Sequence, residues 1–97
     1  MLELVDIDNS TGDIEYNGDI MVKGNVLAGF SVKAKGDVIV QGIVEGATVT
    51  AGGNITFNRG VQGMNKAVIR AGGNIVSKFI ESAELVEAGG NIEADSI

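Results

Sequence analysis

Residues 36–55 read GDVIVQGIVEGATVTAGGNI and contain one complete unit of a repeat that organises the whole chain. The unit opens on a Gly-(Asp/Asn)-(Ile/Val) tripeptide, which occurs seven times in the 97 residues. The longer units step by 18, 17, 20 and 17 residues, starting at Gly18, Gly36, Gly53, Gly73 and Gly90. A unit this short buries an apolar face only by stacking on copies of itself, so the repeat predicts a solenoid.

Apolar residues recur two apart within each unit and at equivalent places in successive units. Alternation of this kind is typical of a strand with one face turned inward, and repetition down a column predicts strands stacked in register. Five to six coils at the usual strand spacing would form a rod roughly 26 Å long. The inward columns are Ile20, Val38, Ile55, Ile75, Ile92; Val22, Val40, Phe57, Ser77, Ala94; Val32, Val49, Ile69, Val86; and Ala34, Ala51, Ala71, Ala88.

The predicted fold is all-β: a single-stranded, right-handed parallel β-helix of about five coils of 17–20 residues, with three short strands per coil. In one coil these strands would lie within residues 36–41, 42–47 and 48–52. Fifteen glycines and no proline suit a chain that turns often, and we expect the glycines to supply positive φ at the corners. Right-handed crossovers are the rule for parallel strands. A left-handed hexapeptide helix is the alternative, suggested by the six-residue steps from Gly12 to Gly24 but not by the later 17- and 20-residue steps.

The composition excludes several kinds of chemistry. The chain has no cysteine and no histidine, so a thiolate nucleophile, a disulfide and the commonest metal ligands and general bases are absent. Asp19 and Asp37 share a corner column, where their spacing resembles that of a retaining glycosidase pair. A convex corner lacks a pocket, however, and the column continues as Asn54, Asn74 and Asn91, which predicts a hydrogen-bonded ladder instead. We expect no catalytic residue, no cofactor, no metal site and no small-molecule substrate.

The net charge of −6 is unevenly distributed. Residues 1–19 carry six acids and no base, residues 20–80 carry all seven bases and two acids, and residues 81–97 carry five acids. The few bases and the lack of an exposed aromatic row disfavour nucleic-acid binding. Two acidic ends also disfavour head-to-tail polymerisation at low salt.

Two features are candidate binding surfaces. The outward column Met21, Ile39, Thr56, Val76 is largely apolar where a polar face is expected, which favours a protein partner or a lateral homodimer. The exposed β-branched residues would also suit a strand without any partner. The second candidate is an insertion, since the coil from Gly53 is about three residues longer than its neighbours near Met64, Asn65 and Lys66.

Three motifs, GNVLAGFSVKAKGD (residues 24–37), GIVEGATVTAGGNI (42–55) and AGGNIVSKFIESA (71–83), closely resemble the β-helical region of the bacterial flagellar assembly protein A family. The resemblance covers residues 22–92. It implies a right-handed β-helix embedded in a longer protein, with a non-enzymatic scaffold role in flagellar assembly or polar organisation through protein partners. It implies no catalytic residues.

Two other bacterial families are similar more loosely. The β-helix of the Min-system septum-site inhibitor dimerises and binds an ATPase, and the bactofilins form self-assembling cytoskeletal polymers. A carbohydrate-active enzyme is the most distant alternative. We expect a single domain over residues 1–97, part of a longer protein because the chain stops eight residues into a coil. We also expect a cytoplasmic location, since there is no membrane-insertion segment and no signal peptide.

Overall fold

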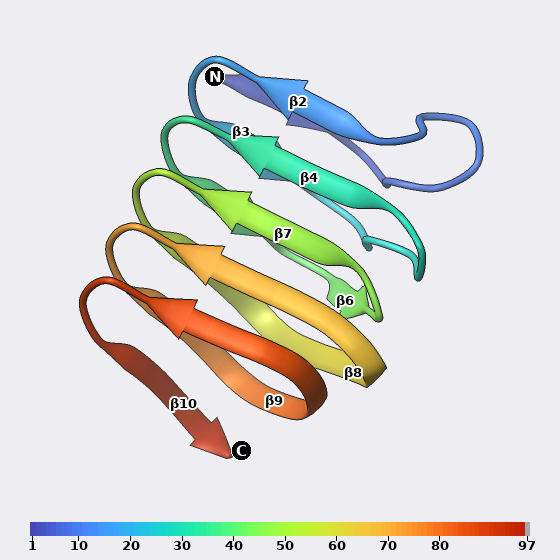
Figure 1. Ribbon diagram of the computed structural model, residues 1–97. Helices are drawn as coiled ribbons and strands as arrows, with labels where there is room; N and C mark the ends of the chain where they lie inside the picture. Colours follow the sequence, from blue (N-terminus) through green and yellow to red (C-terminus); the bar gives the residue numbers. More distant parts are fainter. Residues whose placement is uncertain (97) are drawn as a thin grey trace.

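The computed structural model describes residues 1–96 as strands, corners and turns, with no helix in that range. Figure 1 shows the chain winding as a right-handed coil from the N-terminus at one end to the C-terminus at the other. The strands are β1 (Leu2–Leu4), β2 (Ile14–Tyr16), β3 (Ile20–Val22), β4 (Ser31–Ala34), β5 (Val38–Val40), β6 (Ile43–Glu45), β7 (Thr48–Ala51), β8 (Ile55–Ala71), β9 (Ile75–Ala88) and β10 (Ile92–Ser96). The predicted parallel β-helix is confirmed, and the left-handed alternative is wrong.

Every strand pair is parallel, and the pairs divide into three faces. Face 1 contains β1, β3, β5, the first parts of β8 and β9, and β10. Face 2 contains β6 and the middle of β8 and β9, and is extended toward the N-terminus by single bridges among Ile7, Val26 and Val44. Face 3 contains β2, β4, β7 and the last parts of β8 and β9. The result is a solenoid of about five coils whose longest extent is 30 Å.

Within residues 1–96, separate strands on all three faces occur only in the coil formed by β5, β6 and β7. In the two following coils, register shifts at the corners interrupt the pairing without ending the strand, so β8 and β9 each run along all three faces. In the first two coils, face 2 holds bridges rather than strands. The expected three paired segments per coil are therefore present at the predicted positions. In β8 and β9, however, they form one long strand instead of three short ones.

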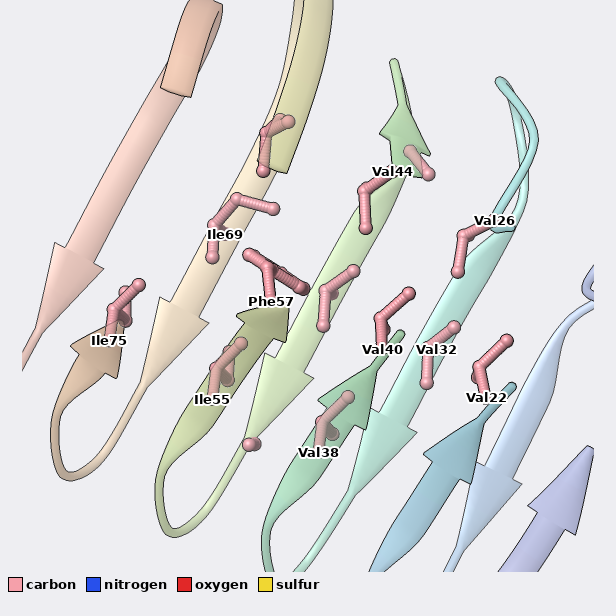
Figure 2. Close-up of a cluster of buried hydrophobic side chains, with 14 of the residues drawn as sticks. Val22, Val26, Val32, Val38, Val40, Val44, Ile55, Phe57, Ile69 and Ile75 are labelled. Atoms are coloured by element: carbon pink, nitrogen blue, oxygen red, sulfur yellow. The ribbon is translucent and has the colours of Figure 1, made fainter. Parts of the chain in front are cut away.

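The core fills the inside of the coil with the four predicted columns and with a fifth, on face 2, that the sequence reasoning missed (Figure 2). The fifth column consists of Ile7, Val26, Val44, Val61 and Ile80. In the first column, Ile20, Val38, Ile55 and Ile75 are fully buried and stack as direct strand partners. Ile92, the last member, is 42 % exposed because it lies in the final coil, with no further coil stacked on it. Burial of this kind contributes roughly 1.5–3 kcal/mol for each large aliphatic side chain.

Phe57 is the largest fully buried side chain, and its column accommodates it with small neighbours on one side. Val40 lies in the coil before it, while Ser77 and Ala94 occupy the next two coils. Ser77 is the buried polar residue of the described core, and its hydroxyl donates to the backbone carbonyl of Phe79 at 2.8 Å. The hydrogen bond satisfies the hydroxyl, so the small side chain makes room for the ring without leaving an unpaired polar atom.

The repeat glycines do not act as expected. In the described residues, only Gly12 and Gly29 among the glycines have a left-handed φ. From Gly36 onward, the glycine that opens a long unit lies instead against the Asp or Asn of the preceding coil. A Cβ on Gly53 would overlap the Asp37 carboxylate, and one on Gly73 would overlap the Asn54 amide. Close approach between coils, rather than positive φ, therefore requires glycine at these corners.

Candidate interaction surface

The outward column predicted from the sequence exists on face 1. Met21 pairs with Ile39, Ile39 with Thr56, and Thr56 with Val76, so the four side chains form one continuous row across four coils. Val76 is 41 % exposed, while the other three are half-buried against one another. Glu3 and Glu93 continue the row beyond Met21 and Val76. The apolar part is therefore a narrow strip between two carboxylates.

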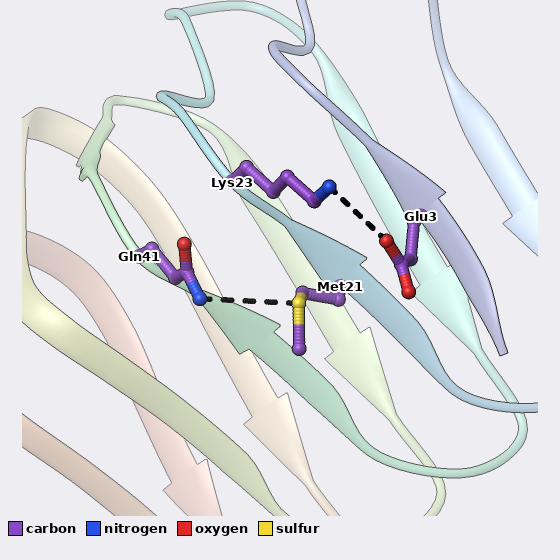
Figure 3. Close-up of polar contacts among 4 residues, drawn as sticks. All are labelled: Glu3, Met21, Lys23 and Gln41. Atoms are coloured by element: carbon purple, nitrogen blue, oxygen red, sulfur yellow. Dashed lines mark hydrogen bonds and ion pairs between the residues drawn. The ribbon is translucent and has the colours of Figure 1, made fainter.

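Two polar side chains, Lys23 and Gln41, flank the strip directly after strands β3 and β5 (Figure 3). The Lys23 ammonium lies 3.2 Å from the Glu3 carboxylate, and both side chains are about half exposed. Gln41 donates from its side-chain amide to the Met21 sulfur at 3.9 Å. The ion pair contributes little stability at that exposure. The two contacts connect side chains of neighbouring coils on the outside of face 1.

The opposite margin of face 1 is the corner column Asp19, Asp37, Asn54, Asn74 and Asn91. The predicted ladder is present, but its hydrogen bonds join side chain to backbone. The side-chain oxygen of each residue accepts the backbone N–H of the next, at 2.7 Å for Asp19 and Asp37 and at 2.8 Å for Asn54 and Asn74. Each bond connects one coil to the next and satisfies a corner donor that strand pairing leaves free.

The same device occurs at the other two corners, which the sequence reasoning missed. Between face 1 and face 2, Asp6 accepts from the Asn25 backbone and Asn25 accepts from the Ile43 backbone, both at 2.8 Å. Between face 2 and face 3, Asp13 accepts from the Ser31 backbone at 2.9 Å. The spacing of 18 or 19 residues between these side chains and their backbone partners was a usable signal, because it equals one coil.

The ladder leaves Asp19 and Asp37 with a structural role at the corner. The main surface depressions lie elsewhere: one of about 460 Å³ is bordered by Tyr16, Lys33 and Lys35 on face 3, and one of about 270 Å³ lies beside Val76 and Lys78 on face 1. Both are open and shallow. Within residues that the structure describes, no three His, Cys, Asp or Glu side chains gather as metal ligands would.

The insertion lies at the corner between face 2 and face 3, where the sequence placed it. Two residues, Gly46 and Ala47, join the paired segments of one coil, whereas residues 63–67 join those of the next. Met64 and Asn65 have φ of 54° and 59°, and Met64 is 52 % exposed. The loop therefore forms a tight, projecting turn whose residues Met64, Asn65 and Lys66 are all exposed.

The corner of the first coil is a separate hydrogen-bonded turn. The Ser10 hydroxyl and backbone N–H both donate to one Asp8 carboxylate oxygen, at 2.6 and 2.9 Å. These bonds favour the charged form and lower the pKa of Asp8 from its ordinary value. Gly12, with φ of 70°, closes the turn.

Phe79 forms an outward aromatic contact that the sequence reasoning did not identify. It is the strand partner of Gly60 on face 2, and a Cβ on Gly60 would overlap its ring. The ring therefore lies over the glycine backbone, which leaves Phe79 half-buried on an outer surface. The signal was available as a glycine inside a strand with an aromatic residue one coil later.

Among the described residues, no helix has the length and apolar character that crossing a membrane requires. The architecture is that of a parallel β-solenoid with one partly apolar outer face. A family model described as the Flagellar Assembly Protein A beta solenoid domain matches residues 1–97, so the chain belongs to that family. Comparisons with curated proteins and with solved structures returned no match.

Proposed function

We propose that this domain is a non-enzymatic scaffold in bacterial flagellar assembly, which acts in the cytoplasm by presenting its flat outer surfaces to protein partners. The observation that carries the proposal is the row Met21, Ile39, Thr56, Val76 on the outside of face 1. A contiguous apolar row on an outer surface is typical of a contact surface. Family membership supplies the link to flagellar assembly.

The chemistry of the chain agrees with a binding role. It offers no histidine or cysteine, and the carboxylates Asp19 and Asp37 accept backbone hydrogen bonds from the next coil. The ladder keeps successive coils at a fixed spacing, so the outward residues of face 1 are held as a regular row. A rigid surface loses little conformational entropy on binding.

A double variant tests the proposal in the bacterium that carries the gene. Ile39→Asp with Val76→Asp places two charges in the apolar row while the inward columns stay unchanged. We expect wild-type protein levels with loss of swimming in soft agar and fewer flagella per cell. Thr50→Asp is the matched control, because Thr50 lies between Lys33 and Arg70 on the outside of face 3. Normal motility of the double variant at normal protein level would contradict the proposal.

A further inference from the structure

We propose that a second copy of the chain covers face 1, with the two rods parallel and related by a twofold axis along the rod. This inference rests on the proposed function, since it names the occupant of the same surface. It depends on how charge is distributed on either side of the apolar row.

The two margins of face 1 differ in chemistry. The margin before the apolar row carries Asp19, Asp37, Asn54, Asn74 and Asn91, whose side-chain oxygens accept hydrogen bonds. The margin after it carries Lys23, Gln41, Asn58 and Lys78, all exposed and all able to donate, and ends in the last coil with the exposed carboxylate of Asp95. In the second and third coils a carboxylate, Asp19 or Asp37, therefore lies across the row from a donor, Lys23 or Gln41.

A twofold axis along the row superposes each margin on the opposite margin of the other copy. Met21 lies two residues from Asp19 and two from Lys23, so rotation about this column brings Lys23 of one copy to Asp19 of the other. In the next coil it brings Gln41 to Asp37. Each contact occurs twice, because the interface uses the same surface from both copies.

The antiparallel arrangement lacks this complementarity. A twofold axis across the row pairs the second coil of one copy with the fifth coil of the other, so Lys23 faces Lys78 and Asp19 faces Asn74. Like charges opposite each other in an interface are unfavourable. Glu3 and Glu93 meet a carboxylate in either arrangement and do not distinguish the two. The charges of face 1 thus favour the parallel dimer.

The contact is small, because the face measures about 24 Å along the rod by roughly 12 Å along the strands on standard spacings. That footprint is about 290 Å² per copy on the same spacings, well below the roughly 800 Å² per partner of a standard specific interface, so we expect a weak dimer. Sedimentation equilibrium up to millimolar concentration should show monomers and dimers. A chain that stays monomeric there would overturn the proposal.

Lys23→Glu distinguishes the two orientations. In the parallel dimer it sets a carboxylate against Asp19 twice, and dissociation should become at least about tenfold easier at low salt. In the antiparallel dimer it would face Lys78 and tighten the complex, an outcome that overturns the parallel arrangement. Glu3→Gln is the matched control: it removes the same ion pair within the chain but keeps Lys23, so it should not weaken the dimer. Circular dichroism checks that each variant folds.

Chemical crosslinking gives an independent reading of orientation, since the chain has no cysteine of its own. Facing sheets lie about 10 Å apart, too far for a disulfide, so a short bifunctional maleimide is used. Met21→Cys should crosslink to itself in the parallel dimer, and Thr50→Cys on face 3 should not. Absence of the Met21→Cys product in a sample that sediments as a dimer would overturn the parallel arrangement.

The motility assay separates the two proposals. If the chain is monomeric but the Ile39→Asp and Val76→Asp variant still loses motility, the dimer is wrong and the scaffold role stands with another protein on face 1. If the chain dimerises through face 1 and the variant swims normally, the dimer stands and the scaffold role is wrong.

Discussion

Asp37 connects its coil to the next one: its carboxylate accepts the backbone N–H of Asn54, 17 residues further along the chain, at 2.7 Å. The same oxygen occupies the space that a side chain on Gly53 would need. Asp37 thus accounts for both residues of the Gly53-Asn54 pair in the next coil. The glycine allows the close approach, and the following residue supplies the donor and then repeats the acceptor role for the next coil.

The corner hydrogen bond needs an acceptor oxygen rather than a charge. We predict that Asp37→Asn changes the free energy of unfolding by less than about 0.5 kcal/mol, whereas Asp37→Ala lowers it by about 1 kcal/mol or more. Urea unfolding followed by circular dichroism measures both. Equal losses in the two variants would show that the carboxylate acts through its charge instead.

Gly53 and Asp37 should be energetically coupled. Gly53→Ala forces a Cβ against the Asp37 carboxylate, and overpacking of this kind costs roughly 1–3 kcal/mol. In the double variant with Asp37→Ala the clash is removed, so the combined loss should fall short of the sum by about 1 kcal/mol. Gly90→Ala is the control partner for Asp37→Ala, because Gly90 packs against Asn74, two coils away from Asp37. That second pair should be nearly additive; coupling of the same size there would contradict the contact.

Deletion of residues 64–66 should leave the fold intact. The deletion joins Gly63 directly to Ala67 and so reproduces the Gly46-Ala47 corner of the preceding coil. Ala47 and Ala67 are both buried, so the shortened corner keeps the same inward residue. We expect a Tm within a few degrees of wild type, followed by circular dichroism. Deletion of residues 48–50 is the control: it removes the buried Val49 and should unfold the chain. A large fall in Tm for the first deletion would show that Met64 and Lys66, which approach Gly46, stabilise the corner.

Filaments should not form at low ionic strength. Residues 1–19 and 81–97 carry acids and no bases, so head-to-tail contact brings like charges together without screening. Negative-stain electron microscopy of the purified chain at low salt should show no filaments. Filaments under those conditions would favour a self-assembling cytoskeletal element over a scaffold.

Four inward columns could be read from the sequence because a period of two within a unit and a fixed step between units leave one arrangement for residues such as Ile55 and Ile75. The same alternation and step between units also predicted that Thr56 and Val76 point outward and lie side by side. The fifth column was missed, because face 2 carries one residue of it per coil, such as Val44 or Val61, and so shows no period of two. The role of Gly53 could not be assigned from backbone propensity alone, since it depends on a side chain one coil away. The Phe79 contact over Gly60 was missed for the same reason: stacking brings together residues 19 apart that no local pattern connects.

The surface on which the proposed function depends was only partly predictable. Alternation identified Ile39 as outward, but how far Met21 and Gln41 cover one another depends on side-chain packing between coils. Sequence spacing contains no information about such lateral contacts. The result is a narrower exposed strip than the residue types alone suggest, with Val76 as its most exposed member.

Photo-crosslinking in living cells shows directly whether another protein chain covers face 1. A photoreactive amino acid is placed at Ile39 on face 1 or, as control, at Thr50 on face 3, in cells producing the protein at its natural level. We predict a covalent adduct from position 39 and little or none from position 50, with the mass of the adduct identifying a second copy or another protein. Folded protein that gives no adduct from position 39, or equal adducts from both positions, would contradict the account.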